Sequence, residues 1–141
     1  MKILIASFLV IVFIFLAAIH IYWAFGGKNP SVATIPTTQN NKAVINPGLF
    51  DCLVVAIGLL SFGLSILIKS GVTSFSSPGW LMNCGLWAIA AIFILRAIGE
   101  FKYIGFFKKI KTTKFGQLDT KYYAPLCLLI GILCVILEFI D

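Results

Sequence analysis

The chain has 141 residues, of which 60% are hydrophobic and 11% are charged, and its formal net charge is +6 at pH 7. Soluble domains carry about 25% charged residues, and a chain with so few cannot build a polar surface. This composition excludes a soluble globular domain, a disordered chain, a collagen and a disulfide scaffold. It predicts an all-α protein whose solvent is the lipid bilayer.

Four apolar runs are long enough to cross a bilayer as helices, since a span needs about 20 residues. They lie at about 3–25, 49–68, 80–98 and 122–140. Each run is continuous rather than alternating, which disfavours a β-barrel. With four spans and short connections, the sequence predicts one membrane domain over 1–141, folded as a four-transmembrane-helix bundle.

The first run begins after Lys2, as the apolar region of a secretory signal does. It is longer than the roughly 7–15 apolar residues of a signal, and no small-x-small cleavage site follows it, so we expect a retained helix. Asn46-Pro47-Gly48 and Ser77-Pro78-Gly79 each predict an N-cap followed by proline at the first helical position. Pro125 is expected in the first turn of the fourth helix.

Helices in lipid associate through small residues and a few polar ones, and each run offers such a stripe. The predicted stripes are Ala6, Val10, Phe13, Ala17, His20 and Ala24; Asp51, Gly58, Ser61 and Ser65; Gly85, Ala88, Ile92, Arg96 and Gly99; and Cys127, Gly131, Cys134 and Glu138. His20, Asp51 and Arg96 lie on these stripes at one depth. We therefore expect them to point into the bundle and to meet near one membrane border.

Between the third and fourth runs, the segment Phe101–Lys111 places Tyr103, Phe106, Phe107 and Ile110 near one helical face and lysines on much of the rest. This pattern predicts a short amphipathic helix in the cytoplasmic interface, with its rings at the acyl boundary and its ammonium groups toward lipid phosphates. A frayed continuation of the third helix is the alternative.

Lysine is unevenly distributed over the two sides of the membrane. One side carries Lys28, Lys42, Lys102, Lys108, Lys109, Lys111, Lys114 and Lys121, whereas the other carries Lys2 and Lys69. Since Lys/Arg bias sets orientation, loops 26–48 and 99–121 are expected in the cytoplasm and both termini outside. Topology and anionic lipid explain the basic charge, and no nucleic-acid motif is present.

The ionisable and aromatic residues near the cytoplasmic border are the candidates for a site. Arg96 and Lys102 would hold an anionic group, since a guanidinium pairs two oxygens at once. His20 would act as a general base beside Asp51 or Glu100. An aromatic rim would receive an apolar tail; its members are Tyr22, Trp23, Tyr122 and Tyr123.

Each of these residues also has a simpler interpretation. Asp51 near a helix start is favoured by the helix dipole, and Arg96 with Glu100 would form an intrahelical ion pair. A lone histidine such as His20 is more often a packing residue than a ligand. Trp23 and Tyr22 are typical interfacial anchors. Their coincidence at one depth favours a functional site, because intramembrane ionisable residues are expensive.

The cysteines indicate packing rather than chemistry. Cys52, Cys84, Cys127 and Cys134 form no CxxC motif, and Cys127 and Cys134 are roughly 10 Å apart by helical rise, which is too far for a disulfide. A single histidine excludes bis-histidine haem within one protomer, and no zinc ligand set is visible. We expect no cofactor and no metal.

Three blocks of sequence carry a family resemblance. They are HIYWAFGG from His20, RAIGEFKYIGFFK from Arg96, and Asp119-Thr120 with Tyr123 and the APLC run that follows it. With these blocks the chain resembles the small bacterial four-helix membrane proteins of the DUF3995 type, a domain of unknown function. The resemblance implies the fold and a bacterial plasma-membrane setting, and it groups Asp119 with His20, Trp23, Arg96 and Glu100. It implies no activity.

Three functions are compatible with these features. The first is a polar site at the cytoplasmic border that binds an anionic amphiphile or a lipid head group, and whether it also catalyses a reaction is open. The second is a structural or partner-binding subunit that packs within or between protomers, including as a homo-oligomer. The third is a small proton-coupled transporter, which is disfavoured because its carboxylates do not lie near mid-membrane.

Overall fold

The computed structural model describes residues 1–27, 34–40, 42–76 and 78–140. Lys28, which contributes to the predicted lysine bias, and Ser77, a predicted N-cap, lie outside these residues. The helices and helical turns are α1 (Lys2–Ala24), α2 (Leu49–Lys69), α3 (Gly79–Ile98), α4 (Lys114–Leu118), the π-helical turn η1 (Asp119–Tyr123) and α5 (Ala124–Ile140).

Four helical stretches are long and apolar enough to cross a membrane. They are Lys2–Ala24, Leu49–Lys69, Gly79–Ile98 and the continuous α4–η1–α5 stretch Lys114–Ile140. Apart from one isolated bridge between Thr37 and Ala43, the described residues contain no β structure. The prediction of an all-α chain with four spanning helices is therefore confirmed. The fourth helix begins earlier than predicted, at Lys114 rather than at 122.

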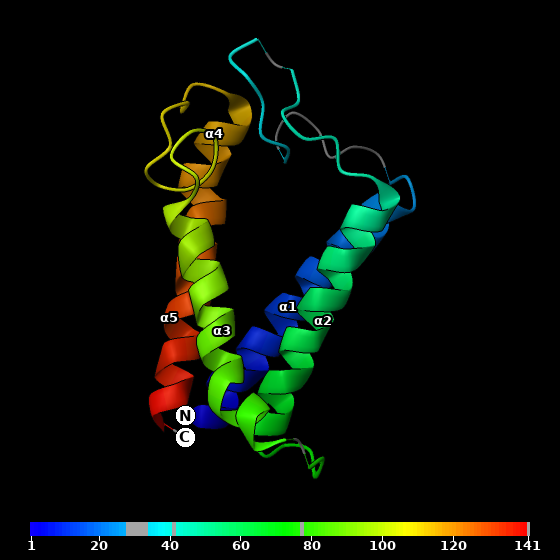
Figure 1. Cartoon of the computed structure of the whole chain (residues 1–141), viewed down its shortest axis with the longest axis vertical. Coiled ribbons are helices and arrows are strands. Elements are labelled where there is room, and N and C mark those ends of the chain that lie inside the picture. Colours follow the sequence, from blue (N-terminus) through cyan, green and yellow to red (C-terminus); the bar gives the residue numbers. More distant parts are fainter. Residues whose placement is uncertain (28–33, 41, 77, 141) are drawn as a thin grey trace.

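The helices form two antiparallel hairpins, α1 with α2 and α3 with α5, which together make a V (Figure 1). The hairpins converge at the end that holds both chain termini and the connection from α2 to α3, which we call the narrow end. They separate toward the opposite, broad end, where the connection from α1 to α2 and the segment 99–113 lie. The described helices thus place both termini on one side of the bundle, as an even number of spans requires.

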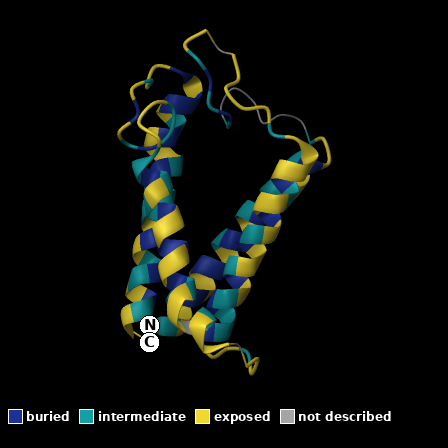
Figure 2. Cartoon of the chain, in the orientation of Figure 1, coloured by how far each residue is buried: buried dark blue, intermediate teal, exposed yellow. Residues whose placement is uncertain are grey.

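The core lies where the hairpins converge. Phe13, Phe62 and Phe93 come from α1, α2 and α3, and their ring centroids lie 5.5–6.4 Å apart. Figure 2 shows the buried residues on the inward faces of the four helices. Near the narrow end the Lys69 ammonium of α2 donates to the Glu138 carboxylate of α5. Aromatic packing and this ion pair hold the two hairpins together.

The predicted stripes of α1 and α5 are largely correct, whereas those of α2 and α3 are wrong. Ser61 and Ser65 donate to the carbonyls of Ile57 and Ser61 one turn earlier in their own helix, so neither hydroxyl needs a partner helix. The faces that are actually buried carry Cys52, Ala56, Leu59, Gly63 and Ile66 in α2, and Leu86, Ile89, Ala90, Phe93 and Ala97 in α3.

The predicted amphipathic helix over Phe101–Lys111 is wrong, because this segment is a folded loop of turns and bends. Within this loop, the backbone amides of Lys109 and Ile110 donate to the carbonyls of Phe101 and Lys102, each eight residues earlier. The loop doubles back on itself rather than continuing α3. The predicted helix starts are also displaced, since Gly48 rather than Asn46 precedes α2 and Pro78 is the N-cap of α3.

Candidate functional site

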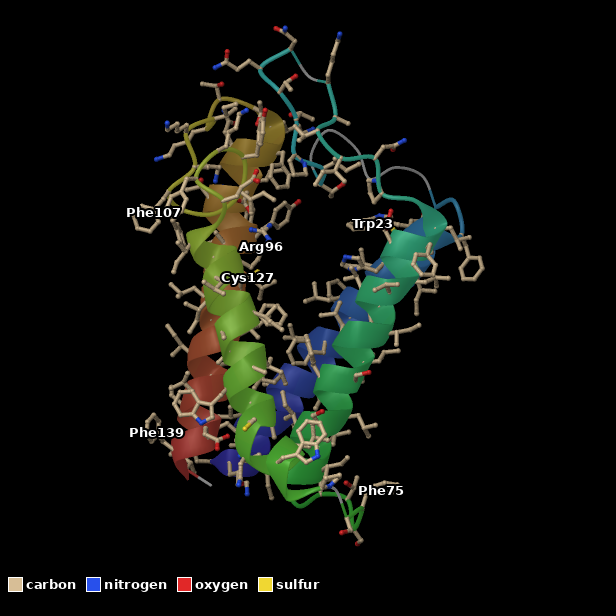
Figure 3. All side chains as sticks on the ribbon, in the orientation of Figure 1. Trp23, Phe75, Arg96, Phe107, Cys127 and Phe139 are labelled. Atoms are coloured by element: carbon tan, nitrogen blue, oxygen red, sulfur yellow. The ribbon has the colours of Figure 1, made fainter. Side chains whose placement is uncertain are left out.

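A cavity of about 230 Å³ lies at the broad end between the two hairpins. Arg96 of α3 and Trp23 of α1 face each other across the V (Figure 3). The cavity is lined by His20, Trp23, Thr34, Ile35, Pro36, Ile45, Pro47, Asp51, Cys52, Val55, Arg96, Ile104 and Phe115. It therefore combines a mostly apolar wall with two charged side chains, Asp51 and Arg96, and one imidazole.

Behind Arg96 lies a buried ionic cluster centred on Asp119, which is fully buried in η1. Arg96 Nη2 donates to Asp119 Oδ1 at 3.0 Å, and Lys108 Nζ donates to Asp119 Oδ2 at 3.0 Å. The Gly105 amide also donates to Oδ2, at 2.7 Å. A buried carboxylate requires such partners, because isolated charge is expensive to bury.

Lys108 is the most enclosed cation of this cluster, with 1% of the residue exposed. Besides Asp119, its ammonium donates to the Gly105 carbonyl at 2.9 Å and to Thr120 Oγ1 at 2.6 Å. All three of its N–H groups thus have an acceptor. Lys108, together with the Gly105 amide, therefore fixes the loop after α3 to the start of the last helical stretch.

Two glycines allow the loop to return to the end of α3. Gly99 and Gly105 both have positive φ, at 84° and 87°. A Cβ on either residue would collide with the backbone on the opposite side of the loop. Phe101 also adopts a positive φ, of 66°, which is uncommon for a residue with a side chain. The Phe106 amide closes the loop by donating to the Ala97 carbonyl at 2.9 Å.

The π-helical turn η1 positions Asp119 in the last helix. Pro125 has no amide hydrogen, and its ring would crowd the carbonyl four residues earlier in a regular α-helix. Widening the helix over Asp119–Tyr123 accommodates this proline and lets the helix continue without a break from Lys114 to Ile140. Pro125 was predicted in the first turn of the fourth helix; it lies in the first turn of α5, but the helical stretch that contains it begins earlier, at Lys114.

Arg96 links the ionic cluster to the cavity. Its Nη2 is bonded to Asp119, while its Nη1 is buried and has no hydrogen-bond partner among the described residues. Because two cations, Arg96 and Lys108, share the single carboxylate of Asp119, the cluster carries one net positive charge. A buried guanidinium nitrogen without an acceptor is costly, and Arg96 lines the cavity from which an acceptor can come.

The opposite wall of the cavity belongs to α1 and α2. His20 Nδ1 lies 2.8 Å from the Leu16 carbonyl, and its ring packs edge-on against Trp23 with centroids 5.2 Å apart. Asp51 Oδ2 accepts a hydrogen bond from the Gly48 amide at 2.9 Å. Asp51 therefore lies in the first turn of α2 and caps it, and it also borders the cavity; its simpler interpretation placed it near a helix start without this hydrogen bond.

The structure brings together four of the predicted site residues around the cavity, His20, Trp23, Asp51 and Arg96, with Asp119 directly behind Arg96. The other candidates lie elsewhere. Glu100 is exposed, because α3 ends at Ile98 and the intrahelical pair with Arg96 cannot form. Lys102 is exposed, with its ammonium 5.0 Å from the centroid of the Tyr103 ring.

The aromatic rim is only partly formed. Tyr22 is 57% exposed and does not line the cavity. Tyr123 is half-buried and stacks against Phe115, a cavity residue, with centroids 6.0 Å apart. Trp23 and Phe115 are the rings that line the cavity itself.

Sequence reasoning missed Lys108, Gly105 and Thr120 as structural partners of Asp119. One signal was present, since Asp119 is the only acidic residue between positions 101 and 121, among six lysines. A lone carboxylate in such a stretch is expected to pair with one of them. Which lysine it selects depends on the fold of the loop, which the local pattern does not encode.

The spanning helices and the polar cavity between them define a multi-pass helical membrane protein. The chain belongs to the family described as protein of unknown function (DUF3995), whose family model matches residues 13–134. This confirms the family resemblance. No curated protein and no solved structure matches the chain.

Proposed function

We propose that the cavity binds the anionic group of an amphiphile or lipid head group, with Arg96 as the residue that contacts it. The observation that carries this proposal is that Arg96 lines the cavity while its buried Nη1 has no hydrogen-bond partner among the described residues. An anionic oxygen there would complete the guanidinium fork, since Nη2 is already held by Asp119.

The charge of the cluster supports an anion rather than a neutral ligand. Arg96 and Lys108 together exceed Asp119 by one positive charge, and the side chains of Lys108 and Asp119 are fully buried. A bound anion would neutralise it. The guanidinium is also held in place by its bond to Asp119, so little side-chain freedom is lost on binding.

The apolar wall supports an amphiphile rather than a free ion. Ile35, Ile45, Val55, Ile104 and Phe115 line the cavity beside the charged groups. Such residues gain nothing from an inorganic ion but would pack against the glycerol and the first methylenes of a lipid. Membrane lipids are therefore the proposed partners.

We further propose that the broad end faces the cytoplasm of a bacterial cell and that both termini face outward. Among the described residues, the broad end carries Lys42, Lys102, Lys108, Lys109, Lys111, Lys114 and Lys121, and the narrow end carries Lys2 and Lys69. This distribution supports the orientation by the positive-inside rule. The proposed site would then lie at the inner leaflet.

A proton-coupled transporter has less support. Such a mechanism needs a carboxylate that exchanges its proton during the cycle, whereas Asp119 accepts three hydrogen bonds from cationic or amide donors. Asp51 caps α2, and Glu138 is paired with Lys69. Each of these carboxylates is thus already engaged by a structural partner within the protein.

The proposal is tested by native mass spectrometry of the purified protein after incubation with phosphatidylglycerol. We expect one retained lipid, and we expect Arg96→Gln to weaken retention about ten- to a hundredfold, because a charged hydrogen bond contributes about 1.5–3 kcal/mol. Arg96→Lys should keep a charge near Asp119 but still weaken retention, since an ammonium cannot bridge Asp119 and the lipid in the same way.

Lys109→Gln is the matched control, because Lys109 is exposed at the same end and outside the cavity lining. It removes the same charge and should retain lipid like the wild type. If the Lys109 and Arg96 variants lost lipid retention equally, the attraction of anionic lipid would be nonspecific. Unchanged retention in both Arg96 variants, with normal helicity, would favour a structural subunit instead.

A further inference from the structure

The two walls of the cavity carry opposite charge. Of the charged residues in the lining, Arg96 lies on the wall formed by α3 and Asp51 on the wall formed by α2. Arg96 belongs to a cluster with one excess positive charge, whereas the partner of Asp51 among the described residues is the neutral Gly48 amide, which donates to its Oδ2. A ligand that carries only an anionic group would complement the charge of only one of the two walls.

His20 adds a hydrogen-bond acceptor to the negative wall. The Leu16 carbonyl, 2.8 Å from His20 Nδ1, can only accept a hydrogen bond, so Nδ1 carries the proton. In the neutral imidazole, Nε2 is then an acceptor. The negative wall therefore offers a lone pair of His20 and the exposed carboxylate of Asp51, and each can accept a hydrogen bond from a ligand.

We propose that the ligand is zwitterionic, with a phosphate that pairs with Arg96 and a primary ammonium that donates to Asp51 and His20. This inference rests on the proposed function and names the class of head group, that of an aminophospholipid. A primary ammonium has three N–H donors, enough for the carboxylate, the imidazole and one further acceptor. A quaternary ammonium has the same charge but no donor, so it would leave both acceptors unsatisfied.

The experiment compares phosphatidylethanolamine, phosphatidylcholine and phosphatidylglycerol, of matched acyl chains, in native mass spectrometry of the full-length protein. We expect the wild type to retain phosphatidylethanolamine about tenfold better than phosphatidylcholine, the difference that one satisfied hydrogen bond to a charged group provides. Asp51→Asn should bring this ratio close to one. The asparagine oxygen can still accept from the Gly48 amide, so α2 keeps its cap.

Retention of phosphatidylglycerol separates the two proposals. Asp51→Asn should retain phosphatidylglycerol at least as well as the wild type, because it removes a negative charge from the cavity. Arg96→Gln should weaken the retention of all three lipids. Glu100→Gln, which removes an exposed carboxylate outside the lining, should preserve the wild-type preference.

A wild type that retains phosphatidylglycerol but does not distinguish the two zwitterionic lipids would overturn this inference and leave the proposed function standing. A wild type that retains none of the three would overturn both. Free phosphoethanolamine serves as a competitor: if it displaces the lipid at comparable concentration, the zwitterionic chemistry is upheld and its source is a soluble compound. Without displacement, the acyl chains contribute and the source is the lipid.

Discussion

Asp119 determines how the charged residues of the broad end are arranged. Its two carboxylate oxygens collect Arg96, Lys108 and the Gly105 amide, which come from α3 and from the loop that follows it. The orientation of Arg96 toward the cavity thus depends on a residue 23 positions later in the chain. Removing the charge of Asp119 should therefore affect both stability and the proposed binding site.

We predict that Asp119→Asn lowers the free energy of unfolding by about 3–5 kcal/mol, which is the cost of removing one charged partner from a buried ion pair. Two cations would lose their shared counter-charge, while the asparagine could still accept from the Gly105 amide. Unfolding by sodium dodecyl sulfate in mixed micelles, followed by circular dichroism, measures the change. Adding Lys108→Met should recover part of the loss, because it removes one uncompensated cation.

Glu100→Gln is the control for this experiment, since Glu100 is an exposed carboxylate in the same part of the chain. We expect a change within about 0.5 kcal/mol, as for other exposed substitutions. A similar loss for both variants would mean that general charge balance, and not the buried cluster, stabilises the broad end.

The sequence predicted that His20, Asp51 and Arg96 meet at one end of the bundle, and all three line the cavity. That inference needed only helix length and residue position, which composition and hydropathy determine well. The sequence did not identify Lys108 as a buried partner of Asp119, because the local pattern of FKYIGFFKKIK fits an amphipathic helix. Tertiary contact with Asp119 and the positive φ of Gly99 and Gly105 override this local pattern.

The helices themselves were predicted well because spanning runs are long and strongly apolar. Their faces were harder to predict, since every face of a helix in lipid is apolar and the hydrophobic pattern is weak. The small residues were the remaining guide to the buried faces, and in α2 they gave the wrong face. The Ser61 hydroxyl donates to a carbonyl of its own helix, and a Cβ added at Gly58 would meet nothing within 4 Å. In α5, Gly131 is a true contact residue.

Gly131 provides a prediction for the α3–α5 hairpin. A Cβ there would lie 2.6 Å from Ile94 Cγ1 and 3.3 Å from the Ala90 carbonyl oxygen, so a larger side chain must push the helices apart. We expect Gly131→Leu to lower the free energy of unfolding by about 1–3 kcal/mol, as overpacking does. Denaturation in mixed micelles measures it. Gly58→Leu, where the added side chain meets open space, should cost nothing and would contradict the packing argument if it were equally harmful.

For the whole molecule, the V explains why a cavity can exist in so small a bundle. The hairpins are joined near the narrow end by the aromatic residues Phe13, Phe62 and Phe93 and by the Lys69–Glu138 ion pair. At the broad end, parts of the first connection and Phe115 of α4 line the cavity between the separated hairpins. The polar groups of the two walls thus lie around one cavity at the broad end, which is where the proposed ligand would bind.

This placement makes the orientation of the molecule a decisive measurement. In a background with the exposed Cys84 changed to serine, we predict that Lys109→Cys reacts with a membrane-impermeant maleimide only after cells are opened. Ser74→Cys, an exposed position in the narrow-end connection, should react in intact cells and serves as the matched control. The opposite pattern would place the cavity at the outer leaflet, and Arg96 and Asp51 would then have to select their ligand from the lipids of that leaflet.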